Sequence, residues 1–167
     1  NSYHFGGCAN LDLSSVSDIL DLTDTTNLSG MFLNCGTITT INNIESWNVS
    51  SVTDMSYMFS SSTSFNQDIS SWNVSSVTDM SSMFVSSTFN QPIGSWTVSS
   101  VTNMNSMFAG VISFNQDISS WDVSSVTDIK EFMIGKSTGD YSYYDNILNS
   151  WSLLTLQPSL DINMGSI

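Results

Sequence analysis

The sequence predicts an α/β repeat solenoid, a stack of about six rungs in which each rung holds a strand and a short helix. A twenty-residue phrase recurs at 65–84 ("FNQDISSWNVSSVTDMSSMF"), 89–108 and 114–133. Its last aromatic position recurs every 24 to 27 residues, at Phe5, Phe32, Phe59, Phe84, Phe108 and Met133. Apolar residues keep their places in each copy, whereas the small polar residues between them vary. A fixed period of this length indicates stacked, equivalent units.

Each unit contains two apolar patterns. Residues 69–74, "ISSWNV", have the spacing L-x-x-L-x-L, which predicts an extended strand with its apolar side chains directed inward. Residues 77–84, "VTDMSSMF", place apolar residues at i, i+3, i+6 and i+7, which predicts a short α or 3₁₀ helix. Thr78 and Asp79 fit the N-terminus of that helix as a cap and an acid in the first turn. A loop then returns the chain to the next strand.

Stacked rungs bring equivalent residues together, so the strands are expected to form a parallel ladder with rungs roughly 4.8 Å apart. The retained apolar residues then form columns that make up the core. The predicted columns are Trp47, Trp72, Trp96 and Trp121; Met55, Met80, Met104 and Ile129; and Met58, Met83, Met107 and Phe132.

The repeat occupies residues 1–140, and residues 141–167 are predicted to form a C-terminal cap. Apolar positions at Ile147, Leu148, Trp151 and Leu154 predict an amphipathic helix of about 12 residues, which Pro158 ends. The segment "SLDINMGSI" that follows is expected to return as a final strand. At the other end, "SYHF" at 2–5 aligns with "SYMF" at 56–59, so the chain begins in mid-repeat and is expected to be a fragment of a longer chain.

The composition excludes some partner classes. The 167 residues include 15 carboxylates but only two cationic side chains, Lys130 and Lys136, and the formal charge is −13. Nucleic-acid binding needs Lys and Arg against phosphate, so we exclude it, and anionic membranes are disfavoured for the same reason. No stretch approaches the roughly 20 apolar residues of a membrane span, so we expect no direct membrane insertion. A Ser- and Thr-rich, Lys-poor chain fits an extracellular place on a cell or particle surface.

The repeated phrase resembles the repeats of the BspA-like surface leucine-rich-repeat family of bacterial surface lipoproteins. "FGGCANL" at 5–11 and "MFLNCGTI" at 31–38 resemble the "AF-x-x-C-x-x-L" step of that family, and "YYDNILNSWSLLTLQ" at 143–157 resembles its closing segment. The resemblance covers nearly the whole chain. It implies a right-handed, leucine-rich-repeat-like solenoid on a surface, often used for adhesion. It implies neither a defined ligand nor catalytic residues.

The exposed side of the predicted strand ladder is the candidate binding face. With Trp and Val directed inward, small polar residues point outward in register, and repeat proteins use such faces for binding. The candidate residues are Ser46, Asn48, Ser71, Asn73, Ser95, Thr97, Ser120 and Asp122. The expected ligand is a surface glycan or a protein. A merely solvated face is an equal alternative, and ice binding is a weaker one, suggested by the hydroxyl ladder of Thr53, Thr78, Thr102 and Thr127.

Stacked carboxylates at Asp54, Asp79 and Asp128, with Asn103 among them, raise the hypothesis of calcium bound between rungs. The preferred interpretation is that these residues cap helices, with Asn103 reducing the repulsion. No other cofactor is expected.

Cys8 and Cys35 each follow a marker Phe by three residues, so they are expected on adjacent rungs. A disulfide is conceivable, but a buried pair of free thiols is preferred. His4, the only histidine, falls at a core position. Asn27, Asn48 and Asn73 open N-x-Ser sequons, which matter for glycosylation only in a eukaryotic source.

The sequence therefore predicts a non-enzymatic surface recognition or adhesion module, because no set of catalytic residues is present. The main alternative is a structural subunit of an extracellular filament or virion appendage, in which copies of the chain stack on one another.

Overall fold

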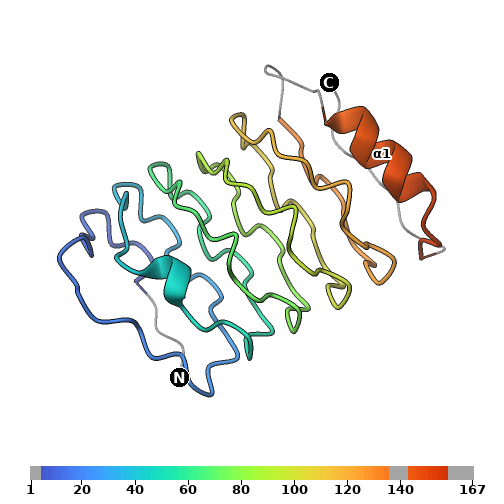
Figure 1. The fold of residues 1–167 in the computed structure, drawn as a ribbon. Coiled ribbons are helices and arrows are strands. Elements are labelled where there is room, and N and C mark those ends of the chain that lie inside the picture. The colour runs from blue at the N-terminus through green and yellow to red at the C-terminus, as the bar shows by residue number, and fades with distance from the viewer. Residues whose placement is uncertain (1–4, 136–142, 158–167) are drawn as a thin grey trace.

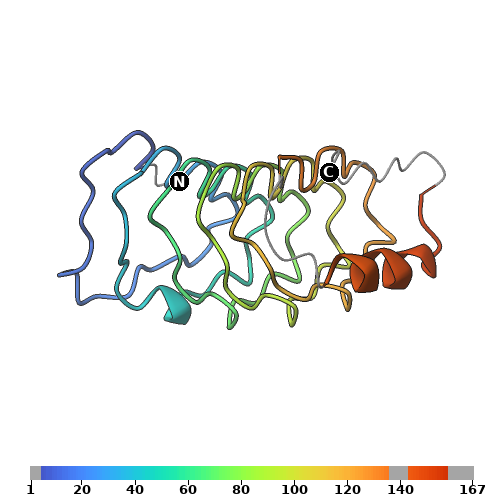
Figure 2. The same ribbon diagram turned by 90° about the horizontal axis from the view of Figure 1, so that it is seen from above.

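The computed structural model describes residues 5–135 and 143–157. Over residues 5–135 the chain winds in successive circuits that lie side by side in sequence order, and we call each circuit a rung (Figure 1). The view from above shows the same order from the N-terminal end to the helix at the other end (Figure 2). Rungs begin at the marker positions Phe5, Phe32, Phe59, Phe84 and Phe108.

Regular secondary structure is sparse among these residues. It consists of the 3₁₀ helix η1, Ile44–Ser46, and the α-helix α1, Tyr144–Ser152. Among the described residues, strand-like pairing between neighbouring rungs is limited to isolated parallel bridges, at Leu13–Ile41, Asn27–Asp54, Asp54–Asp79, Asp79–Asn103 and Asn103–Asp128. The predicted class, a leucine-rich-repeat-like stack of strand and short-helix rungs with a parallel strand ladder, is therefore wrong.

The segment predicted as a short helix is instead a series of tight turns. The N–H of Met83 donates to the Met80 carbonyl at 3.3 Å, whereas the N–H of Phe84 donates to the Met107 carbonyl of the next rung at 3.0 Å. Ser82 has a left-handed φ of 55°. An α-helix needs every N–H to bond four residues back and every φ near −63°. Because N–H groups alternate here between their own turn and the next rung, a helix cannot form.

The predicted strand over residues 69–74 is broken by a turn. The N–H of Trp72 donates to the Ile69 carbonyl at 3.1 Å, so the backbone is not extended there. Trp72 reaches the preceding rung through its side chain, and its Nε1 donates to the Ile44 carbonyl at 2.8 Å. A strand ladder needs consecutive extended residues on both rungs. The turn removes that condition, and a side-chain bond joins the rungs instead.

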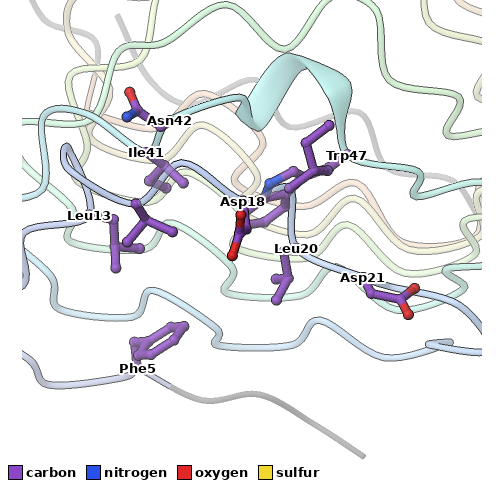
Figure 3. A pocket seen from close by; sticks show the side chains of 10 residues that line it. Phe5, Leu13, Asp18, Leu20, Asp21, Ile41, Asn42 and Trp47 are labelled. Atoms are coloured by element: carbon purple, nitrogen blue, oxygen red, sulfur yellow. The ribbon is translucent and has the colours of Figure 1, made fainter.

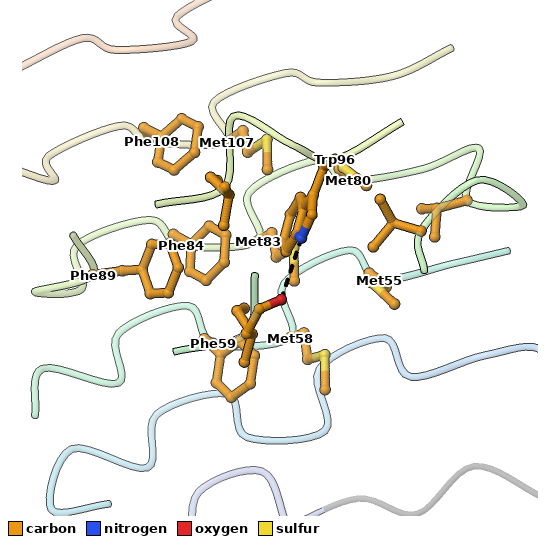
Figure 4. Packing of buried hydrophobic residues seen from close by; sticks show 14 of the residues in the cluster. Met55, Met58, Phe59, Met80, Met83, Phe84, Phe89, Trp96, Met107 and Phe108 are labelled. Carbon is orange, nitrogen blue, oxygen red and sulfur yellow. Dashed lines mark hydrogen bonds between the residues drawn. The ribbon is translucent and has the colours of Figure 1, made fainter. Parts of the chain in front are cut away.

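The predicted core residues are confirmed. Every member of the tryptophan and methionine columns is at most 6% exposed. The marker phenylalanines form a further column, in which the ring of Phe84 lies 5.9 Å from Phe59 and 5.6 Å from Phe108. Phe89, from the next "FNQ" segment, stacks beside Phe84 at 4.1 Å (Figure 4). Each such burial stabilises the fold by about 1.5–3 kcal/mol, so the columns rather than a sheet hold the rungs together.

Helix α1 packs against the end of the stack through one face. Ile147 and Trp151 are buried, and the Trp151 ring meets Phe132 edge to face at 5.7 Å. The helix was predicted with about 12 residues and has nine, and Leu148 is exposed on its outer side. The final strand proposed within 158–167 and the boundary at 140/141 lie outside the described residues.

Candidate binding face

The eight candidate residues form one exposed surface, which we call the serine–asparagine face: Ser46, Asn48, Ser71, Asn73, Ser95, Thr97, Ser120 and Asp122. All eight are exposed, and they alternate with the buried tryptophans and with buried valines such as Val74. Exposed and buried residues therefore alternate here as they would in a strand, although these segments do not form strands. Turns on each rung produce this alternation by directing Trp and Val inward.

Tryptophan side chains fix the position of this face from below. The indole Nε1 of Trp96 donates to the Ile69 carbonyl at 3.2 Å, and that of Trp121 donates to the Ile93 carbonyl at 3.1 Å. A buried indole N–H needs such an acceptor, and each bond joins one rung to the previous one. The outward residues beside each tryptophan are therefore held in register.

Part of the polar capacity of the face is used internally. The Ser71 hydroxyl donates to the Glu45 carbonyl at 2.7 Å, and the Ser120 hydroxyl donates to the Gly94 carbonyl at 2.8 Å. Asn73 Oδ1 accepts the Ser75 hydroxyl at 2.8 Å, and Asn48 makes the equivalent turn. Within the described part of the chain, Nδ2 of Asn48 and Asn73 has no hydrogen-bond partner. The face therefore presents amide donors to an incoming ligand.

The second copy of the phrase, residues 89–108, places a glycine where the other two copies have serine. A Cβ on Gly94 would clash with the backbone carbonyl oxygen of Asp117 on the next rung. The close approach of that backbone explains why glycine stands here, beside Pro92. The neighbouring Ser95 and Thr97 remain exposed, so the face is continuous across this rung.

The carboxylates on and beside the face stay charged well into acid. Hydrogen bonds from the Ser124 hydroxyl and N–H lower the pKa of Asp122. The Ser119 hydroxyl and N–H lower the pKa of Asp117 in the same way, and for Asp68 the Ser70 N–H makes the larger contribution. Lys130, the one described cation, is not on the face. The surface is therefore polar and anionic at neutral pH.

The three candidate calcium ligands do not meet in one place. Asp54 and Asp79 are joined by a bridge, but Asn103 lies between Asp79 and Asp128. Their Oδ1 atoms accept backbone N–H groups two residues on, from Ser56 (2.9 Å), Ser81 (2.8 Å) and Lys130 (3.1 Å). These are turns and not the helix caps that were predicted. Over residues 5–135 and 143–157, no group of three or more His, Cys, Asp or Glu is placed to hold a metal ion.

The threonine ladder and the sequons have internal bonds. The hydroxyls of Thr53, Thr78, Thr102 and Thr127 each donate to the carbonyl of the equivalent threonine on the preceding rung, at 3.0–3.2 Å. Nδ2 of Asn27 donates to Asp54 Oδ2 at 2.9 Å. The other two sequon residues, Asn48 and Asn73, are exposed.

Both cysteines are free thiols in the structure. Cys35 is buried and donates to the Phe5 carbonyl at 3.1 Å, and its burial raises the pKa of the thiol. Cys8 is exposed, so the prediction of a buried free thiol is confirmed for Cys35 and wrong for Cys8. His4 lies outside the described residues.

The Asn and Gln residues of the "FNQ" segments link neighbouring rungs, although the sequence predicted only a returning loop there. Asn66 Oδ1 accepts the Asn90 N–H at 2.8 Å, and Gln91 Nε2 donates to the Asn66 carbonyl at 3.0 Å. Asn90 repeats the arrangement toward the next rung, where it accepts from Gln116 Nε2 at 2.9 Å. The signal for this ladder was present in the sequence, since Asn and Gln recur at the same register.

A family model described as "Mycoplasma protein of unknown function, DUF285" matches residues 2–91 and 26–151. Comparison with curated proteins and with solved structures gives no match. The two matched segments together cover most of the chain and include every repeated rung. The chain therefore belongs to the DUF285 family of Mycoplasma proteins of unknown function.

Proposed function

We propose that this chain is a non-enzymatic surface recognition module that binds its ligand through the serine–asparagine face. The observation that carries the proposal is the register of eight exposed polar residues on rungs held by buried side chains. A rigid array loses little conformational entropy on binding. Equivalent groups on successive rungs also let weak contacts add together along the stack.

The chemistry of the face supports a protein ligand with amide and cationic groups more than a glycan. The tryptophans beneath the face are at most 6% exposed and offer no ring for a sugar to stack on. Asp122 and the neighbouring Asp68 and Asp117 provide negative charge, and asparagine amides provide donors. Charge complementarity of this kind sets partner choice and association rate.

A place on the outside of a cell or particle accords with the resemblance to surface lipoproteins of the BspA-like type. Within the described ranges, no helix has the length and apolar character needed to cross a membrane.

The test is binding of the purified chain to a cell and glycan array and to immobilised candidate proteins. A double variant, Ser71→Lys with Asn73→Lys, places two cations in the middle of the face. We expect it to lose most of the binding that the wild-type chain shows. The same array run with calcium and with a chelator tests whether a cation contributes.

A matched control is the pair Thr88→Lys with Ser113→Lys, which adds the same charge on exposed residues outside the face. The Thr88 hydroxyl donates to the Thr63 carbonyl at 3.1 Å, so this pair also removes a hydroxyl-to-carbonyl bond, as does the Ser71 change. The control is expected to bind like the wild type. Equal losses in the two double variants, or no binding by any form, would sink the proposal.

The alternatives have less support in the geometry. Stacking of copies end to end, as in a filament, would have to displace or cover α1, whose Trp151 already packs on the last described rung. Ice binding would need free hydroxyls, whereas the threonine ladder donates to its own backbone.

A further inference from the structure

A pocket of about 320 Å³, partly open to solvent, lies between the first rung and the start of the second. Its wall is mostly apolar, and its principal lining residues are Leu13, Val16, Ile19, Leu20, Ile41 and Trp47 (Figure 3). Val16 and Ile19 are 44% and 53% exposed. Ligand pockets in proteins have volumes of roughly 300–1,000 Å³ and are lined by apolar side chains with a few polar groups. This pocket has the size and lining of a small-molecule site.

The loop that forms the outer wall is held in place by the next rung. Leu13 forms a parallel bridge with Ile41. Asn42 Nδ2 donates to the Ser14 carbonyl at 2.5 Å, and Asn43 Nδ2 donates to the Ser17 carbonyl at 3.1 Å. These bonds fix the backbone on both sides of Val16 and immediately before Asp18. The pocket is therefore a positioned feature.

Asp18 differs from the other carboxylates of this loop. Asp12 and Asp21 accept the N–H groups of Ser14 and Thr23, each at 2.9 Å, and so serve their own turns. Asp18 lines the pocket and has no hydrogen bond or ion pair within the described part of the chain. Its charge is therefore available to a ligand in the pocket.

We propose that this pocket binds a small organic cation with an apolar body, such as an arylalkylammonium. The apolar wall accepts the body, and the Asp18 carboxylate pairs with the ammonium group. The net charge of −13 raises the local concentration of any cation. Among the described residues, no Lys or Arg lines the pocket to compete for Asp18.

The test is a titration at low salt with 2-phenylethylammonium, followed by NMR shifts of the Trp47 indole and of backbone amides at 13–20. We expect saturable shifts confined to these residues. The neutral probe 3-phenyl-1-propanol should bind more weakly, and the anion 3-phenylpropionate should not bind. Asp18→Asn should weaken the cation by about fivefold and leave the neutral probe unchanged.

Asp24→Asn is the matched control, because Asp24 is an exposed acid of the same rung that does not line the pocket. It should bind the cation like the wild type, and thermal melts should show that both variants fold. The proposal is overturned if no shifts saturate, if the two variants weaken the cation equally, or if the neutral probe binds as tightly as the cation. None of these results bears on the serine–asparagine face, which Asp18→Asn leaves intact.

Discussion

The rungs that carry the repeated phrase, residues 65–133, close their core, whereas the first rung, residues 5–31, leaves part of it open. Phe65, Phe89 and Phe114 of the repeated "FNQ" segments are all at most 2% exposed. On the first rung, Val16 and Ile19 are about half exposed and border the pocket. Apolar residues are present in both regions, so composition alone does not explain the difference.

The difference follows from polar links between rungs. In the repeated region, Asn66 and Gln91 tie each returning loop to the next one. The first two rungs lack "FNQ", and the loop over the pocket is held by the Leu13–Ile41 bridge and by bonds from Asn42 and Asn43. The apolar residues of the phrase therefore build the core, and its Asn and Gln residues close the wall around that core.

The largest difference in the free energy of unfolding is expected when a marker phenylalanine is replaced by alanine in each region. Phe84 is fully buried and stacks on Phe59, Phe89 and Phe108, so Phe84→Ala should lower the free energy of unfolding by about 3–5 kcal/mol. Phe5 is only partly buried and, within the described part of the chain, stacks on one ring, that of Phe32, so Phe5→Ala should cost about 1–2 kcal/mol. Urea unfolding monitored by circular dichroism measures both. Equal losses would show that the first rung is as well packed as the repeats.

A smaller effect is expected from removing one asparagine of the ladder. Asn66→Ala removes the acceptor of the Asn90 N–H and one acceptor of Gln91 Nε2, and should cost about 0.5–1.5 kcal/mol. Protease sensitivity at the 60–66 loop should rise together with this loss.

Asn10→Ala on the first rung is the control for that change, because Asn10 is exposed and has no bond within the described residues. It should change stability by less than about 0.5 kcal/mol. If Asn10→Ala costs as much as Asn66→Ala, the asparagine ladder does not account for the closed wall.

The core and the exposed face were predictable from the sequence because burial depends on periodicity alone. Trp72 and Val74 point inward and Ser71 and Asn73 point outward, as the spacing indicates, whether the backbone is a strand or a turn. Apolar residues at i, i+3 and i+4 likewise fit a helix or a series of turns equally well. Periodicity therefore identified the buried residues and misassigned the backbone.

The turns left a signal that was visible only across rungs. Two registers have left-handed φ on successive rungs: Gly30, Tyr57, Ser82, Ser106 and Glu131; and Gly7, Asn34, Ser61, Ser86, Gly110 and Gly135. Left-handed φ is costly for residues other than Gly and Asn, so the glycines and the asparagine that recur at the second register indicated turns. Because Ser82 and Glu131 occupy the same register, a single repeat does not reveal the turn.

No sequence pattern indicated the pocket role of Asp18, because this residue lies outside the repeated phrase.

The smallest expected effect is on the loss of stability at low pH, and it should be alike in the two regions. Hydrogen bonds from the Ser119 hydroxyl and N–H lower the pKa of Asp117 in the folded state. The stability that ionised Asp117 contributes is therefore complete above the unfolded-state pKa of about 3.9 and is lost as pH falls through the lower folded-state pKa. Asp12 makes the same local turn with Ser14 on the first rung. Asp117→Asn and Asp12→Asn keep the accepting oxygen and should both reduce the loss of stability between pH 5 and pH 2, measured by urea unfolding, relative to the charge-matched Asp24→Asn. A response from Asp117→Asn alone would mean that turn strength, and not only the ladder between rungs, separates the two regions.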